Sequence, residues 1–301
     1  MINLLKSIEI DREKWDNCIR SSKGSKPYAY SWFLDIMTPG WEALTEDDYE
    51  SVFPLPQRRK FGVSYLTTPA FVQQLGAFSP DNSQTQAIDE FLDFLPPYYW
   101  LVDMGVGQRI SHDHFKAVLR TNYELDLSKS YEKIYNGFTT HCRRNVDKSQ
   151  KKKFELVDDI SPEELISLFR NNKGKDIKRI TSADYQRLNT LINFCIRNKK
   201  GRIIGVRKAQ KKILYGLFLL EVKGIKTMLL VVNTPESRDK RVGYYVINEL
   251  IRESASTKTM LDFAGSSIPS IASFMESFGS INKPYYQIYR NRLPWPVKLF
   301  R

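Results

Sequence analysis

Three apolar segments follow one another closely in the second half of the chain. Residues 201–207, 213–222 and 226–232 are rich in β-branched, leucine and aromatic side chains, and only short links rich in lysine and glycine separate them. Segments of this composition that are joined by turn residues favour consecutive antiparallel strands. Apolar residues then recur at helical spacing through 246–251. A three-stranded meander followed by a helix therefore restricts this region to a mixed α/β fold.

A basic segment lies between the third predicted strand and this helix. It contains Arg238, Lys240 and Arg241, and Gly243 stands where we expect the helix to begin. A helix N-terminus has unpaired N–H groups and a partial positive charge, so a cationic loop ahead of it suits a phosphate group. A solvated basic turn would have the same sequence, and the spacing alone does not choose between the two interpretations.

The first half of the chain repeats this order of strands, helix and strands. We expect a helix at 87–95 and strands at 41–44, 51–55, 61–66, 99–104 and 116–127, with turns at 45–48 and 56–60 between the first three strands. The chain therefore predicts two similarly built α/β domains, over 1–128 and 129–301, in which residues of about 290–301 pack back on the first domain. Ser128 can cap the helix that opens the second domain.

Net charge and cysteine content restrict the class of partner and compartment. The formal charge of +12 over 301 residues favours a polyanionic partner, which could be nucleic acid, a phosphorylated small molecule or an anionic membrane face. The three cysteines are scattered and form neither a disulfide framework nor a metal-binding spacing. Without a signal-like N-terminus or an apolar stretch of about 20 residues, we expect a cytoplasmic protein with no membrane segment.

The predicted helix after 128 is strongly basic in its C-terminal half. Lysine favours a helix C-terminus, and a run of charge usually forms a solvated face. The alternative is an electropositive ridge that guides an anionic substrate. The cations of this basic ridge are Arg143, Arg144, Lys148, Lys151, Lys152 and Lys153.

Two segments resemble a known family. Residues 261–266 (LDFAGS) and 268–279 (IPSIASFMESFG) resemble the C-terminal motifs of FemAB-type proteins, a branch of the GNAT acyltransferase superfamily. Residues 143–149 (RRNVDKS) are similar to the R-x-N-x-x-K-A segment of that family, with Ser149 in place of alanine. The chain lacks the long charged helical hairpin of some members, and Tyr244 stands where the pyrophosphate loop has a second small residue.

This resemblance implies a fold and an activity. The fold would be two tandem GNAT-like domains, each with a mixed, mostly antiparallel sheet flanked by helices. The activity would be transfer of an aminoacyl group, from aminoacyl-tRNA, to an amine of a peptidoglycan precursor or similar anionic acceptor. An acyl-CoA-dependent N-acyltransferase and a non-catalytic RNA-binding protein on the same fold are the alternatives. The donor would be a co-substrate, and no resident cofactor is expected.

Acyl transfer to an amine needs groups that orient the amine and stabilise charge on the carbonyl oxygen. Asp262 stands between a predicted strand and a Gly-Ser turn, where it could accept the proton of the amine, although it could equally bond loop backbone or cap a helix. Arg238, Lys240, Arg241 and Gly243 would bind the donor phosphate. The candidate acceptor-binding residues are Tyr215, Tyr244, Gln73, Gln74 and Arg109.

Other catalytic motifs are missing from the sequence. There is no G-x-S-x-G, no H-E-x-x-H and no Walker loop, so the hydrolase, metalloprotease and NTPase classes lack support. His112 and His114 have no third ligand at a suitable spacing, so we expect no metal site.

Overall fold

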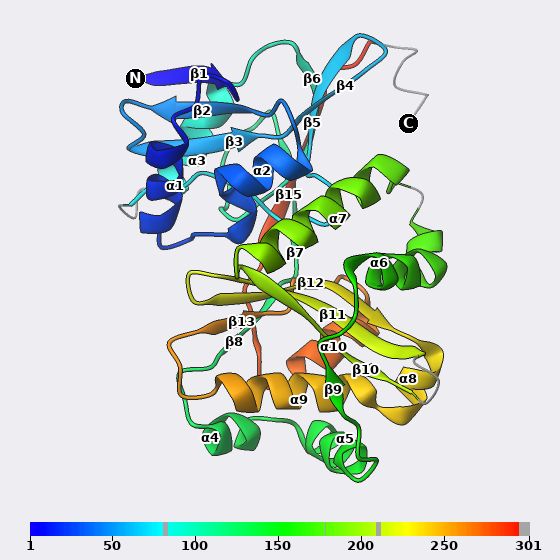
Figure 1. Ribbon diagram of the computed structural model, residues 1–301. Helices are drawn as coiled ribbons and strands as arrows, with labels where there is room; N and C mark the ends of the chain where they lie inside the picture. Colours follow the sequence, from blue (N-terminus) through cyan, green and yellow to red (C-terminus); the bar gives the residue numbers. More distant parts are fainter. Residues whose placement is uncertain (81–83, 178, 209–211, 295–301) are drawn as a thin grey trace. The chain divides into compact units, whose positions relative to one another are not determined.

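The computed structural model describes residues 1–80, 84–177, 179–208 and 212–294 (Figure 1). The chain forms two compact units, Met1–Arg120 with Pro284–Arg301, and Thr121–Lys283. The predicted strand at 116–127 is in fact two strands that belong to different units. The return to the first unit begins at Pro284, earlier than the expected position near 290, because β15 (Tyr285–Asn291) pairs with strands of that unit.

The first unit has two sheets. A three-stranded antiparallel sheet has the order β1-β2-β3, and a five-stranded sheet has the order β4-β5-β6-β15-β7. Its strands are β1 (Ile2–Lys6), β2 (Glu42–Glu46), β3 (Ser51–Leu55), β4 (Gln57–Lys60), β5 (Val63–Thr67), β6 (Tyr99–Val106) and β7 (Lys116–Arg120). Its helices are α1 (Arg12–Ser21), η1 (Pro27–Ala29), α2 (Ser31–Met37) and α3 (Gln84–Asp93).

Strand β4 contradicts the prediction that residues 56–60 form a turn. Its sequence is polar, yet it is the outer strand of the five-stranded sheet, and among the strands of the described residues it pairs with β5 alone. Because an edge strand faces water, charged side chains are tolerated there and discourage pairing with other chains. The hydrophobic alternation that identifies a strand is therefore missing.

The second unit is built on one seven-stranded sheet of order β14-β8-β13-β12-β11-β10-β9. Its strands are β8 (Tyr123–Asp126), β9 (Leu156–Val157), β10 (Gly201–Arg207), β11 (Ile213–Val222), β12 (Ile225–Asn233), β13 (Met260–Asp262) and β14 (Ile281–Asn282). Its helices are α4 (Tyr131–Asn136), α5 (Thr140–Gln150), α6 (Pro162–Asn171), η2 (Lys173–Asp176), α7 (Ser182–Arg197), α8 (Pro235–Lys240), α9 (Val242–Ser254) and α10 (Pro269–Glu276).

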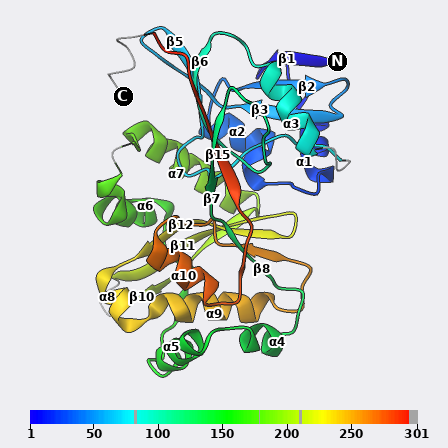
Figure 2. The same cartoon turned by 180° about the vertical axis from the view of Figure 1, so that it is seen from behind.

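The predicted meander of β10, β11 and β12 is confirmed, and it is the centre of this unit. Residues 213–220 of β11 are all buried. Figures 1 and 2 show the reason, since α9 lies along one face of the sheet and α6 and α7 lie on the other. A strand that is covered on both faces is apolar throughout rather than alternating. Helix α5 packs on the outer side of α9.

The basic segment of 130–157 is not one helix. Gly137 ends α4, and the Thr139 side chain accepts a hydrogen bond from the Cys142 N–H to begin α5. Ser130, not Ser128, caps α4 by accepting from the Lys133 N–H. Lys151 is the C-cap residue of α5, so the basic ridge continues beyond the helix.

Candidate functional site

Strands β12 and β13 lie side by side for a short distance and then part. They pair in parallel only over Ile225–Thr227 and Met260–Asp262. Beyond this point β12 continues to Asn233 paired with β11, whereas the chain after Asp262 bends away through Ala264, which has a positive φ of 55°. Within the described residues, the outer edge of β12 from Met228 to Asn233 therefore has no partner strand. Apart from the Asn233 carbonyl, which accepts a hydrogen bond from Arg238, backbone N–H and C=O groups along such an edge are available to a ligand.

A bulge lies in this free part of β12. Phe218 of β11 pairs with Leu230, and the next residue, Leu219, pairs with Met228, so Leu229 has no opposite residue on β11. A bulge of this kind bends a strand and redirects its backbone groups. The free edge thus coincides with a local distortion of the strand.

Four elements converge where β12 ends. A Cβ atom placed on Gly243, in the first turn of α9, would lie 3.4 Å from Asn233 Nδ2, 3.5 Å from Tyr215 Cε2 and 3.6 Å from Phe274 Cζ. The Asn233 Oδ1 atom is buried and forms no hydrogen bond with any described residue. Burial raises the pKa of Tyr215, so its hydroxyl keeps its proton. A hydrogen-bond acceptor and a protonated hydroxyl thus lie near each other at the end of the free edge.

A second polar cluster lies where α8 meets α9. Arg241 joins the two helices in a left-handed conformation with φ of 63°. Its Nε donates to Asn145 Oδ1 at 2.7 Å, and Asn145 Nδ2 donates to His141 Nε2 at 2.8 Å. The Tyr244 ring packs against Phe274 with ring centroids 4.8 Å apart. Asn145 therefore fixes the positions of a guanidinium and an imidazole beside the start of α9.

The structure corrects the predicted phosphate loop. Residues 235–240 form α8, so Arg238 and Lys240 lie on a helix rather than in a loop. The Arg238 Nη1 donates to the Asn233 carbonyl at 2.8 Å, and the Lys240 Nζ lies 2.8 Å from Glu236. The Cα of Gly243 faces packed side chains, as described above. The role of these residues in donor binding stays a prediction.

Asp262 is fully buried at the point where β12 and β13 part. Its Oδ1 accepts a hydrogen bond from the Ala264 N–H at 2.8 Å, which is the loop interaction that the sequence left open as an alternative. Its neighbour in the parallel register is Thr227, whose hydroxyl is buried without a hydrogen-bond partner among the described residues. A role for Asp262 in proton transfer stays a prediction.

One cation of the basic ridge is held by hydrogen bonds, and the others are exposed. The Arg143 Nη1 donates to the carbonyl oxygens of Asn136 at 3.1 Å and Phe138 at 2.8 Å, so this side chain holds the turn between α4 and α5. The remaining ridge residues, Arg144, Lys148, Lys151, Lys152 and Lys153, are exposed.

Gln73, Gln74 and Arg109 belong to the first unit, whereas the candidate site residues described so far belong to the second. Gln74 is buried and its Nε2 donates to Gln73 Oε1 at 3.4 Å, whereas Arg109 is exposed. Their role in acceptor binding stays a prediction.

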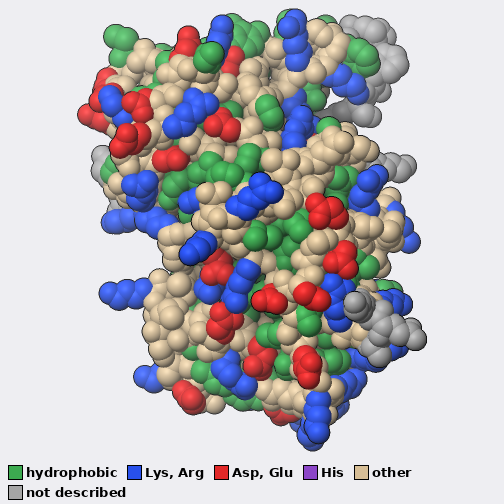
Figure 3. All heavy atoms as spheres, viewed as in Figure 1, with side chains coloured by type: hydrophobic (Ala, Val, Ile, Leu, Met, Phe, Trp, Pro, Cys, Tyr) green, Lys and Arg blue, Asp and Glu red, His purple; other side chains and the backbone are tan. Residues whose placement is uncertain are grey.

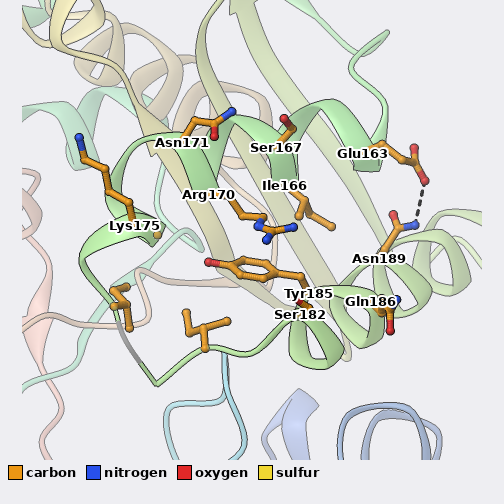
Figure 4. A pocket seen from close by; sticks show the side chains of 13 residues that line it. Glu163, Ile166, Ser167, Arg170, Asn171, Lys175, Ser182, Tyr185, Gln186 and Asn189 are labelled. Atoms are coloured by element: carbon orange, nitrogen blue, oxygen red, sulfur yellow. Dashed lines mark hydrogen bonds between the residues drawn. The ribbon is translucent and has the colours of Figure 1, made fainter.

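The sequence did not indicate a cavity between α6, η2 and α7 (Figure 4). It has a volume of about 740 Å³. The Arg170 guanidinium lies over the Tyr185 ring, 4.9 Å from its centroid, and Asn189 Nδ2 donates to Glu163 at 2.9 Å. No residue of β11, β12 or α9 lines it. Helical spacing through 162–197 is the signal that could have identified its walls.

The described residues form neither a candidate metal site nor a candidate membrane-spanning helix. No group of three or more His, Cys, Asp or Glu side chains could hold a metal ion there, and His112 Nε2 instead lies 3.0 Å from Asp93. In the same part of the chain, no helix combines the length and apolar character needed to cross a membrane.

No protein-family model matches the sequence, and neither does any curated protein. Solved structures do match. FemX is 11% identical with a TM-score of 0.66, and the match covers 97% of this chain and 98% of FemX. The chain has a FemX-like fold. The mixed α/β architecture that the FemAB resemblance implied is thereby confirmed.

Two further structures of this fold match over most of their length. L-PGS from Bacillus licheniformis is 12% identical with a TM-score of 0.51, and the match covers 96% of this chain and 95% of L-PGS. The C-terminal domain of a putative lysylphosphatidylglycerol synthetase from Agrobacterium fabrum is 10% identical with a TM-score of 0.53. That match covers 93% of this chain and 91% of the domain. At these identities the likeness establishes the fold alone.

Proposed function

We propose that this protein transfers an aminoacyl group from aminoacyl-tRNA to an amine of a peptidoglycan precursor or a similar anionic acceptor. The observation that carries this proposal is the FemX-like fold over 97% of the chain. The sequence motifs at 143–149, 261–266 and 268–279 support it independently, because they resemble those of FemAB-type aminoacyltransferases.

The geometry along the free edge of β12 supports this chemistry. In the reaction the amine nitrogen forms a bond to the ester carbonyl carbon, the bond to the tRNA ribose oxygen breaks, and a base moves the amine proton to that oxygen. The N–H groups along this edge suit the negative charge that develops on the carbonyl oxygen. Asp262 lies beside Thr227, where the free edge begins, and is the candidate for the base. Asn233 Oδ1 and the Tyr215 hydroxyl lie at the far end of the edge, about 20 Å from Asp262, where they can hydrogen-bond another part of a substrate.

The test is a transfer assay with labelled aminoacyl-tRNA and a muropeptide precursor, followed by mass spectrometry of the acceptor. We expect product with the wild-type protein and a loss of about 100-fold or more in Asp262→Asn, within the usual range for a lost acid or base. Tyr123→Phe is the matched control for Tyr215→Phe, because Tyr123 is a buried tyrosine of the same unit whose hydroxyl donates to Glu276 at 2.8 Å. Tyr215→Phe should slow transfer, and Tyr123→Phe should not.

The same assay separates the alternatives. If a panel of charged tRNAs yields no product while an acyl-CoA does, the donor in this proposal is wrong. If neither donor gives product and Asp262→Asn binds RNA as tightly as the wild type, the protein is an RNA-binding protein. In that case the exposed residues of the basic ridge should determine the salt dependence of RNA binding. The slope of log K against log salt concentration should be about −0.7 for each phosphate of a single strand that they contact.

A further inference from the structure

The hairpin of β4 and β5 has an unusual tip. Phe61 is 94% exposed, and it forms the two-residue turn with Gly62, at φ values of 50° and 79°. The two preceding residues, Arg59 and Lys60, are exposed cations, and the Lys60 Nζ lies 5.3 Å from the centroid of the Phe61 ring. A large apolar ring thus projects into solvent beside two positively charged residues.

The register of the sheet brings further aromatic residues to the same end. Strands β5 and β6 are parallel, and Ser64 pairs with Tyr99, so β6 begins beside the hairpin tip. Trp100 is bulged out of the register and is 43% exposed, and Tyr98 is 41% exposed. Because neighbouring strands lie about 4.8 Å apart, these rings and the tip share one end of the sheet.

Strand β15 ends at this same place. The Arg292 N–H donates to the Trp100 carbonyl at 2.7 Å, and the Arg292 side chain is exposed. In Figure 3, lysine and arginine side chains lie beside hydrophobic ones at the end of the first unit where β4 and β5 turn. We name this surface the hairpin patch, and its residues are Arg59, Lys60, Phe61, Tyr98, Trp100 and Arg292.

Protection of an edge strand explains only part of this surface. Cations on β4 would discourage pairing with another chain, but Phe61 has no such effect. An exposed phenyl ring adds nothing to folding, since it keeps its apolar area in water. A polar residue or glycine would form the same turn with less apolar surface. We therefore expect the ring to contact another molecule.

We propose that the hairpin patch binds the surface of an anionic lipid bilayer. Tryptophan and tyrosine rings favour the interface between lipid and water, lysine and arginine are attracted to anionic headgroups, and an apolar tip enters the acyl boundary. A single-stranded nucleic acid also stacks on aromatic rings, but its binding sites are grooves that follow the phosphate backbone. The projecting tip of a two-residue turn fits a bilayer better than a groove-bound strand. This binding surface is independent of the proposed transfer activity.

The test is sedimentation of the full chain with vesicles. We expect binding to vesicles of equal parts phosphatidylglycerol and phosphatidylcholine, and little binding to phosphatidylcholine alone. Phe61→Ser should lower the partition coefficient about tenfold by removing the apolar contact. Arg59→Gln with Lys60→Gln should lower it about 25-fold, at about fivefold for each cation near the surface. Raising the salt concentration should weaken wild-type binding.

Matched controls come from the same unit. Ile8→Ser removes an 88% exposed apolar side chain outside the hairpin patch and should leave partitioning unchanged. Because Ile8, Arg59, Lys60 and Phe61 are all exposed, the melting temperatures of the variants should equal that of the wild type. Equal partitioning of wild type and both hairpin variants would overturn the proposal. The proposal would also be overturned if the protein did not bind vesicles but bound single-stranded RNA tightly through Phe61.

Discussion

Replacing Arg290 should make the protein more stable. This side chain on β15 is 7% exposed, and its Nε and Nη2 atoms are buried without a hydrogen bond to any described residue. Its guanidinium lies over the Phe115 ring, 4.6 Å from the centroid. Burial, and to a smaller extent the charge of Arg292, lower the pKa of Arg290 to about 10. The charge is therefore poorly compensated in the folded state.

The magnitude follows from this pKa. A lowering of this size corresponds to roughly 3 kcal/mol of destabilisation, at about 1.4 kcal/mol for each pH unit. The unfolded chain holds this proton to higher pH than the folded chain, so the destabilisation is fully present below pH 10 and declines above it. Methionine keeps much of the volume but loses the cation–π contact, which offsets about 1–2 kcal/mol. The net gain in Arg290→Met should be about 1–2 kcal/mol at neutral pH.

Scanning calorimetry at pH 7.5 measures this gain. The melting temperature of the first unit should rise by about 3–6 °C in Arg290→Met. Arg292→Met is the matched control, because Arg292 is exposed at the end of the same strand and its loss should change stability little. A fall in melting temperature of several degrees in Arg290→Met would refute the reasoning, since it would mean that the guanidinium has a stabilising partner.

Three further outcomes follow from the second unit. Gly243→Ala should be tolerated or stabilise α9 by about 0.5–1 kcal/mol. Gly205→Ala should instead lower the melting temperature, because its Cβ would lie 2.3 Å from a neighbouring side chain and 2.5 Å from a backbone oxygen. In an NMR titration Glu236 should stay ionised to about pH 2, because bonds to two lysines lower its pKa, and Lys208→Met should raise the midpoint. Burial raises the pKa of Cys142 to about 11, so a thiol reagent at pH 8 should modify it only after unfolding.

The central meander could be predicted because its strands are apolar on both faces. Residues 213–222 contain no turn residue apart from Gly216, and burial on both faces preserves this pattern in the sequence. The same reasoning failed for β4, whose side chains face water, and for the two strands within 116–127. Nothing local shows that consecutive strands pair in different sheets, since pairing depends on distant partners.

The candidate site was predicted by residue type more than by position. Tyr215, Gly243 and Tyr244 do lie near one another, although the sequence had assigned the two tyrosines to acceptor binding and the glycine to donor binding. Asn145 and Asn233 were missed as individual site residues. Their importance rests on hydrogen bonds, one made to Arg241 and one left unmade at Oδ1, and only the folded chain reveals these.

The start of α9 bears on the donor that we propose. A pyrophosphate loop needs consecutive backbone N–H groups in an open turn, with small residues that let the phosphates approach. Here α8 fills the preceding segment, Arg241 alone joins the helices, and the Cα of Gly243 faces Asn233, Tyr215 and Phe274. Tyr244 adds a ring packed on Phe274 rather than free space. These contacts oppose close backbone approach by coenzyme A, while the guanidinium that Asn145 positions can meet a single phosphate. These contacts support the proposal of aminoacyl-tRNA, rather than coenzyme A, as the donor.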